Sequence, residues 1–149
     1  MTILRAPVLV AVALLGALLV SAPGSSATSP ASERSAASAA ARTRVIADCA
    51  HRSIKPHRVV VTCADAGVYA VVKSYGSWRA TAALGQGRLH LNDCEPSCAD
   101  GTFHSFPATF RFHRVVHTSH GPLFTRLGVT YVRGGEQRNA QYSLPRRPL

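Results

Sequence analysis

Alternation of apolar and polar residues is the clearest structural pattern in this chain of 149 residues. Over residues 107–117, Ala108, Phe110 and Phe112 recur at every second position, and mostly polar residues lie between them. Residues 123–132 alternate in a similar way. Because successive side chains of a strand point to opposite faces of a sheet, both segments are predicted to be strands with one buried face.

Four more segments are predicted to be strands because they are β-branched or alternate: residues 57–62, 68–73, 78–84 and 88–91. Turn-forming residues separate the predicted strands: residues 63–67, 74–77, 86–87 and 119–122. In the third of these strands, the alternation places Trp78 and Leu84 on the same face. No segment keeps the 3.6-residue apolar period of a helix over several turns. The pattern therefore predicts an all-β fold, a small antiparallel β-sandwich or barrel.

The first residues of the chain are typical of a secretory signal peptide. Arg5 precedes an almost continuous apolar run over residues 6–20, and small residues follow at 25–27. The apolar run is shorter than the ~20 residues that span a bilayer. We therefore predict a signal-peptide helix over residues 1–27, cleaved after Ala27, with an uncleaved N-terminal anchor as the alternative. The mature protein is then secreted, extracellular or associated with the cell envelope, and has no transmembrane segment.

Composition divides the rest of the chain into three parts. Residues 28–44 are rich in Ser and Ala and carry no large apolar side chain, so they are predicted to be a disordered linker. Residues 45–133 contain the predicted strands and form one disulfide-bonded β domain. Residues 134–149 are mostly polar and are predicted to be a flexible tail.

All four cysteines, Cys49, Cys63, Cys94 and Cys98, lie in the predicted domain. An exported protein reaches an oxidising compartment, where its cysteines form disulfides. Four cysteines allow three pairings. We favour Cys49–Cys63 with Cys94–Cys98, because Pro96 bends the short loop between the second pair.

Histidines raise the question of a metal site at two places. Zinc is the alternative to the Cys94–Cys98 bond, with His90 and His104 as further ligands of a suitable type, but an oxidising compartment favours the disulfide. The second place is a predicted hairpin end, where three candidate ligands gather: His113, His117 and His120. Exposed histidines without a metal are the more common outcome there, so we predict no metal and no cofactor.

The cysteine motifs also resemble those of known proteins. The segments CADAG at 63–67, YGSWRA at 75–80 and NDCEPSCADGTFHSFP at 92–107 resemble a group of small secreted actinobacterial proteins. The resemblance extends over about residues 49–132, and the cysteine loop is its most specific part. The group has no assigned activity, so the resemblance implies export and disulfide bonding and indicates no catalytic residue.

The formal net charge of the chain is +10 at pH 7, which attracts anionic polymers of the cell envelope. The alternative explanation for the positive charge is an arginine-rich composition that arises from coding bias. Arg111, Arg126 and His113 supply outward basic groups, but the predicted faces lack the outward aromatic residues of a nucleic-acid module. We therefore predict no specific nucleic-acid partner, and we predict a monomer.

Trp78, Tyr75 and Arg79 are the candidate binding residues. Together they can form an aromatic platform for a sugar or a peptide, with the arginine at its rim. The alternative is that Trp78, the one tryptophan of the chain, anchors the core, because large aromatic side chains dominate the burial of small domains.

Ser105, His104 and Asp100 supply the residue types of a hydrolase within one stretch. The sequence lacks a nucleophile-elbow motif, and closeness in sequence does not provide the required geometry. We therefore assign no catalytic residue. The sequence favours a secreted, non-catalytic binding or structural module, with a small secreted hydrolase or a histidine-based metal-binding protein as alternatives.

Overall fold

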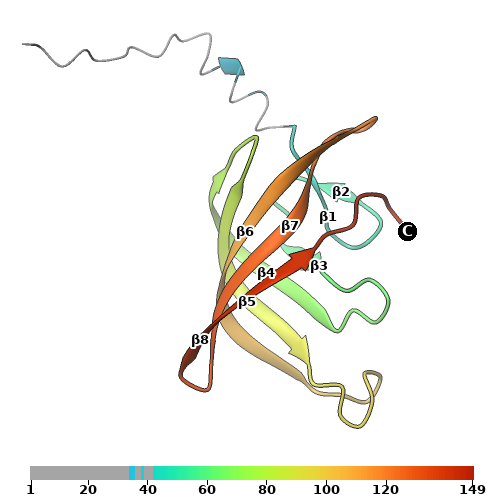
Figure 1. The fold of residues 1–149 in the computed structure, drawn as a ribbon, viewed down its shortest axis with the longest axis vertical. Helices are drawn as coiled ribbons and strands as arrows, with labels where there is room; N and C mark the ends of the chain where they lie inside the picture. Colours follow the sequence, from blue (N-terminus) through green and yellow to red (C-terminus); the bar gives the residue numbers. More distant parts are fainter. Residues whose placement is uncertain (1–33, 36–37, 39–41) are drawn as a thin grey trace, which may run out of the picture.

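The computed structural model describes residues 34–35, 38 and 42–149, and its fold is an antiparallel β structure, as predicted. The strands are β1 (Val45–Ile46), β2 (Arg52–Ser53), β3 (Arg58–Val60), β4 (Val68–Trp78), β5 (Ala83–Asn92), β6 (Phe103–Thr118), β7 (Gly121–Arg133) and β8 (Glu136–Ser143). The last six pair with their chain neighbours in the order β3-β4-β5-β6-β7-β8, and this sheet curls into a half-barrel (Figure 1). The predicted signal peptide, 1–27, lies outside the described residues.

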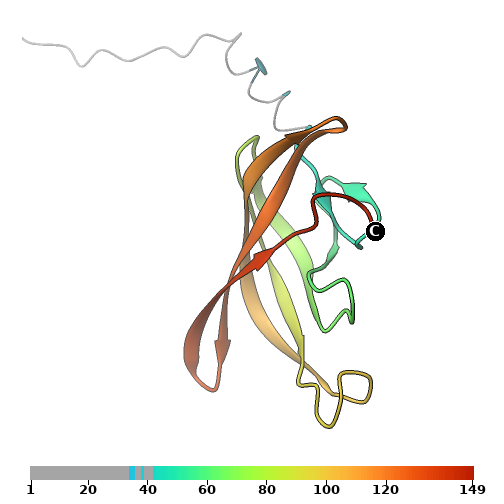
Figure 2. The same ribbon diagram turned by 45° about the vertical axis from the view of Figure 1, so that its right-hand side comes forward.

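The core lies on the inner, concave face of the half-barrel. Strands β5, β6 and β7 supply its largest fully buried side chains, among them Phe110, Phe112, Phe124, Leu89 and Leu127. The two short strands β1 and β2 lie on the inner side of the curled sheet (Figure 2). Val45 and Ile46 of β1 are fully buried. The predicted inward positions of β6 are therefore confirmed. The segment that contains β1 and β2 covers part of this inner face.

Strand β4 is longer than predicted. It continues through Gly76 to Trp78, and two irregularities in its pairing with β5, between Val72 and Ser74 and between Tyr75 and Ser77, leave one extra residue at each place. These are β-bulges, which bend a strand without ending it. The predicted break at 74–77 is therefore wrong.

The turn between β4 and β5 lies later in the chain than predicted. The backbone N–H of Arg79 donates to the carbonyl oxygen of Ala82 (2.8 Å), which closes the hairpin. The predicted strand over 78–84 is wrong, since its middle is this turn, and Leu84 is half-exposed on the face opposite the core. The predicted turn at 86–87 is also wrong, because both residues lie inside β5.

The predicted flexible tail over 134–149 contains a strand instead. Strand β8 pairs with β7 along its whole length, from Arg133 opposite Glu136 to Arg126 opposite Ser143. Leu144, which follows the strand, is only 4% exposed and packs into the core. Pairing along β7 and this apolar contact hold a segment whose own sequence is almost entirely polar.

The end of the predicted linker over 28–44 also packs against the domain. Thr43 is buried, and its carbonyl oxygen accepts a hydrogen bond from Nε1 of Trp78 (2.9 Å). The backbone of Arg44 bonds to that of Pro122 (3.1 Å) and Phe124 (2.9 Å) beside the start of β7. Among the described residues, no helix has the length and apolar character to span a membrane.

Both predicted disulfides are present, Cys49–Cys63 and Cys94–Cys98. The first joins the loop between β1 and β2 to the turn that follows β3, so it fixes the segment covering the inner face to the main sheet. The second closes a small ring within the loop between β5 and β6. With both cysteines of this loop in a disulfide, the alternative zinc site has lost two of its ligands.

Candidate functional site

The outer face of the sheet is the surface of β3–β8 that points away from the core, and it carries four arginines. They are Arg58 on β3, Arg88 on β5, Arg111 on β6 and Arg126 on β7. The strand register places Arg58 and Arg88 in one outward row, opposite Val71, and Arg111 and Arg126 in two adjoining outward rows beyond the row of Gln86 and Thr109. Each lies next in sequence to a buried or inward residue and therefore points outward. The result is a basic surface drawn from four strands.

This outer face carries no compensating acidic side chain. Across β3–β8 the one acidic residue is Glu136, which pairs with Arg138 at the start of β8. Within the part of the chain that the structure describes, none of the four outer arginines forms an ion pair. Positive charges without nearby carboxylates produce a positive surface potential, which concentrates anions.

A shallow hollow lies at the centre of this face. At the first bulge of β4, Val72 pairs with Gly87 and Ser74 pairs with Gln86, so Lys73 is the extra residue. A Cβ atom on Gly87 would overlap the carbonyl oxygen of Val71. Glycine is therefore required for the close approach of the two backbones at the bulge.

The hollow has a volume of about 460 Å³, and apolar atoms form most of its lining surface, with neutral polar side chains among them. Its side chains come from β4 to β8: Lys73, Gln86, Thr109, Thr130, Val132 and Gln137. The Thr130 hydroxyl donates to Oδ1 of Asn139 (2.7 Å), and the Gln86 amide donates to Ser74 Oγ (3.2 Å). Amides and hydroxyls of this kind both donate and accept hydrogen bonds.

One end of the outer face carries a stack of aromatic and basic groups. The rings of Tyr69 and His90 are stacked with centroids 4.4 Å apart, and the guanidinium carbon of Arg58 lies 4.0 Å from the Tyr69 centroid. Phe103 contacts the same tyrosine at 5.3 Å and is 43% exposed. The expectation that outward aromatic residues are missing is therefore wrong for this end of the sheet.

Burial and the neighbouring charges favour the neutral form of the imidazole in this stack. Burial lowers the pKa of His90 below its ordinary value, and the nearby positive charges of Arg88 and Arg58 lower it further. Arg88 is itself fixed, because its guanidinium donates to Oγ (2.6 Å) and to the carbonyl oxygen (3.1 Å) of Ser105. The arginine is thus held in place with part of its donor set still available.

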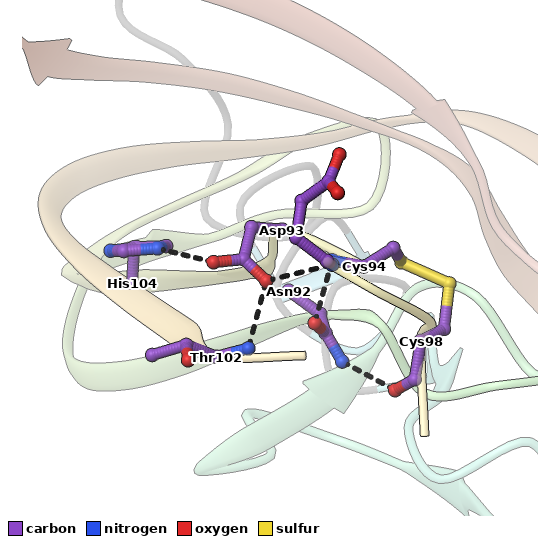
Figure 3. A network of polar contacts seen from close by, with 7 residues as sticks. Asn92, Asp93, Cys94, Cys98, Thr102 and His104 are labelled. Carbon is purple, nitrogen blue, oxygen red and sulfur yellow. Dashed lines mark hydrogen bonds and ion pairs between the residues drawn. A yellow bond between two sulfur atoms is a disulfide. The ribbon is translucent and has the colours of Figure 1, made fainter. Parts of the chain in front are cut away.

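The loop between β5 and β6 holds a polar network around Asp93 (Figure 3). One carboxylate oxygen of Asp93 accepts from the backbone N–H groups of Thr102 (2.8 Å) and Glu95 (3.2 Å). The other lies 2.9 Å from Nε2 of His104. These contacts, with the bond to His104 the largest contribution, lower the pKa of Asp93 to about 2. Asn92 bridges the same loop to the carbonyl oxygen of Cys98 (2.8 Å).

The hydrolase residues suggested by the sequence do not come together. His104 is bonded to Asp93, while the hydroxyl of Ser105 accepts from Arg88. Asp100 accepts a hydrogen bond from Ser97 Oγ (2.7 Å). Each of the three predicted groups thus has a separate partner, and the Asp93–His104 pair serves the loop geometry instead of activating the serine.

The three candidate metal ligands are likewise dispersed. His113 Nε2 lies 3.3 Å from the side-chain oxygen of Gln141, and His120 contacts the adjacent Ser119. Arg114 has a φ of 57°, which interrupts the regular strand between His113 and His117. Over the described residues, no three His, Cys, Asp or Glu side chains are grouped so that they could hold a metal ion.

Trp78 and Tyr75 are engaged within the domain. The Trp78 ring packs edge-on against Phe124 (5.5 Å) and Tyr75 (5.1 Å). The Tyr75 hydroxyl donates to the carbonyl oxygen of Pro56 (2.8 Å), and burial raises its pKa. This packing favours the core interpretation of Trp78, while Arg79 is exposed in the turn before β5.

The sequence did not identify the hollow or the aromatic stack, although it identified Arg111 and Arg126 as outward basic residues. Both features depend on which residues face each other across strands, such as Tyr69 and His90. Comparison of the chain with protein-family models, with curated proteins and with solved structures gives no match.

Proposed function

We propose that this protein is an exported, non-catalytic binding module that attaches to anionic polymers at the cell envelope or outside the cell. The outer arginines, which have no ion-pair partner among the described residues, carry the proposal. The signal-peptide pattern and the two disulfides support export, because disulfides persist in oxidising compartments. The resemblance to small secreted actinobacterial proteins supports the same location.

The residue type and its placement both suit a polymer. A guanidinium is planar and presents several N–H donors, so it binds carboxylates and phosphates in a bidentate manner. Neighbouring strands are about 4.8 Å apart. Arginines on β3, β5, β6 and β7 therefore form an extended series of contacts, which suits a chain of repeated charges better than one small anion.

Non-catalytic binding is favoured by the partners of the reactive side chains. Ser105 is held by Arg88, and His104 is held by Asp93 in a loop. Nucleophilic catalysis requires a base within hydrogen-bond reach of the nucleophile, and neither contact provides it.

The test removes two charges from the face and, in a matched control, two charges from elsewhere. Arg111→Gln/Arg126→Gln alters the outer face, and Arg146→Gln/Arg147→Gln removes the same charge from the exposed C-terminal residues. Dissociation constants for polygalacturonate and polyphosphate are measured at two salt concentrations, with neutral dextran as a reference polymer. We expect the face variant to bind at least one of the two polyanions about tenfold more weakly and with a smaller salt dependence. We expect the control to change little.

Equal weakening in the two variants would mean that net charge alone attracts the polymer, and the proposal for the outer face would be wrong. Binding of neither polyanion at low salt would reject the proposed function altogether. Circular dichroism of both variants checks that the sheet is intact.

A further inference from the structure

The hollow on the outer face differs in chemistry from the arginines around it. We propose that it is a sugar-binding subsite, and that the polymer is therefore a polysaccharide whose units carry anionic groups. This inference rests on the proposed function and names the class of its ligand. Its volume of about 460 Å³ is within the roughly 300–1,000 Å³ of small-molecule sites.

The polar side chains of the lining match the hydroxyl groups of a sugar ring. Gln86 and Gln137 present amides and Thr109 presents a hydroxyl, groups that both donate and accept, while the Thr130 hydroxyl, which donates to Asn139, can accept. Sugar hydroxyls have the same dual character. A chain of bare phosphates offers only acceptors at neutral pH, so a hollow for polyphosphate would be lined by cations, and here Lys73 is the one cationic lining residue.

Most of the lining surface of the hollow is apolar. Val132 is 51% exposed, and Pro107 lies beside it as its neighbour in the outer row of β5–β7. Sugar rings have C–H faces that pack against such surfaces, because burial of apolar area is favourable whatever the ligand. An exposed valine near the end of β7 has a direct use in this arrangement.

Charged groups lie on both sides of the hollow along the strands. Gln86 on β5 is opposite Thr109 on β6, and Arg88 and Arg111 lie two residues away in opposite directions. Two residues of a strand extend about 7 Å. A ring in the hollow therefore has an arginine on either side, where anionic groups of the same unit or of adjoining units would bind.

The aromatic stack favours a polysaccharide over a single-stranded nucleic acid. Tyr69 lies on β4 between the strands of Arg58 and His90, so both faces of its ring are covered by these neighbours. Bases bind to exposed aromatic faces, and none of the outward aromatic side chains at this end lines the hollow. The Tyr69 ring is therefore engaged within the sheet surface, and the exposed Phe103 lies away from the hollow.

The experiment uses Thr109→Val, which removes a hydroxyl from the hollow without changing charge or strand propensity. Thr102→Val, in the exposed loop before β6, is the matched control. The full chain is titrated with polygalacturonate, polyphosphate and single-stranded DNA. We expect Thr109→Val to weaken polygalacturonate binding about threefold, to leave polyphosphate binding unchanged, and Thr102→Val to change neither.

A second measurement does not depend on a variant. Titration with free D-galacturonate, followed by NMR, is expected to shift the backbone amides of Gln86, Thr109 and Thr130 most. Shifts confined to other strands would overturn the sugar subsite.

The remaining outcomes separate the two proposals. If Arg111→Gln/Arg126→Gln weakens binding of both polyanions but Thr109→Val weakens neither, the outer face binds anions and the sugar subsite is wrong. If single-stranded DNA binds most tightly, the ligand class is wrong. If no polymer binds, the proposed function itself is rejected.

Discussion

Among single residues, His90 links the outer face to pH. Its pKa is lowered in the folded protein, first by burial and then by Arg88 and Arg58, from an ordinary value of 6.5. Above that pH the imidazole is neutral in both the folded and the unfolded chain, so its titration does not change the free energy of folding. As the pH falls below 6.5, the unfolded chain takes up the proton first, so stability decreases until the pH reaches the lower pKa of the folded protein.

The expected result is a steeper loss of stability in acid for the natural protein than for His90→Phe. The phenylalanine keeps an aromatic ring against Tyr69 and cannot titrate. Urea unfolding at several pH values from about 7.5 down to about 5 measures the free energies. Identical pH slopes for the two proteins would show that folding does not lower the pKa of His90.

Among the elements, β8 has the least expected role. Its pairing with β7 covers the edge of a strand that carries the buried side chains Leu127 and Val129, and Leu144 closes the core behind it. A chain that ends at Gly135 would expose this edge and these apolar groups to water. An unpaired, apolar strand edge promotes aggregation.

We therefore expect truncation after Gly135 to abolish cooperative unfolding or to make the protein insoluble. Truncation after Pro145 removes only exposed terminal residues, and we expect it to lower the melting temperature by a few degrees at most. Thermal unfolding followed by circular dichroism distinguishes the two truncated chains. A soluble, cooperatively folded chain ending at Gly135 would show that β8 is dispensable, as its polar sequence had suggested.

The difference between β6 and β8 shows what the sequence can predict. Strand β6 carries a continuous apolar row on one face, so its alternation indicated both the strand and its buried side. Strand β8 has few apolar residues, and its pairing depends on an edge that another strand provides. Local pattern contains no information about such an edge.

The candidate site could not be predicted from local sequence pattern for the same reason, since its residues are far apart in the sequence. Lys73, Gln86, Thr109 and Thr130 become neighbours only through the register of four strands, and that register includes a bulge. Gly76 and Gly87 looked like turn residues because glycine is common in turns. In the sheet, one is the extra residue of a bulge and the other permits close backbone contact.

In the molecule as a whole, the two disulfides have different tasks. Cys49–Cys63 joins positions 14 residues apart and fixes the segment that covers the inner face. The N–H of Val60 in β3 also donates to the carbonyl oxygen of Ala47 in that segment (2.6 Å). Cys94–Cys98 joins positions 4 apart and stays within one exposed loop. A longer closed loop removes more entropy from the unfolded chain.

For loops of these lengths, a disulfide is expected to stabilise the folded protein by about 3 kcal/mol for Cys49–Cys63 and about 2 kcal/mol for Cys94–Cys98. The difference should widen in the protein, because loss of the first bond also frees the cover of the core from the sheet. We therefore expect Cys49→Ala/Cys63→Ala to lower the free energy of unfolding more than Cys94→Ala/Cys98→Ala does. Urea unfolding of both variants measures this, and a larger loss from the loop disulfide would mean that the covering segment is held by its packing alone.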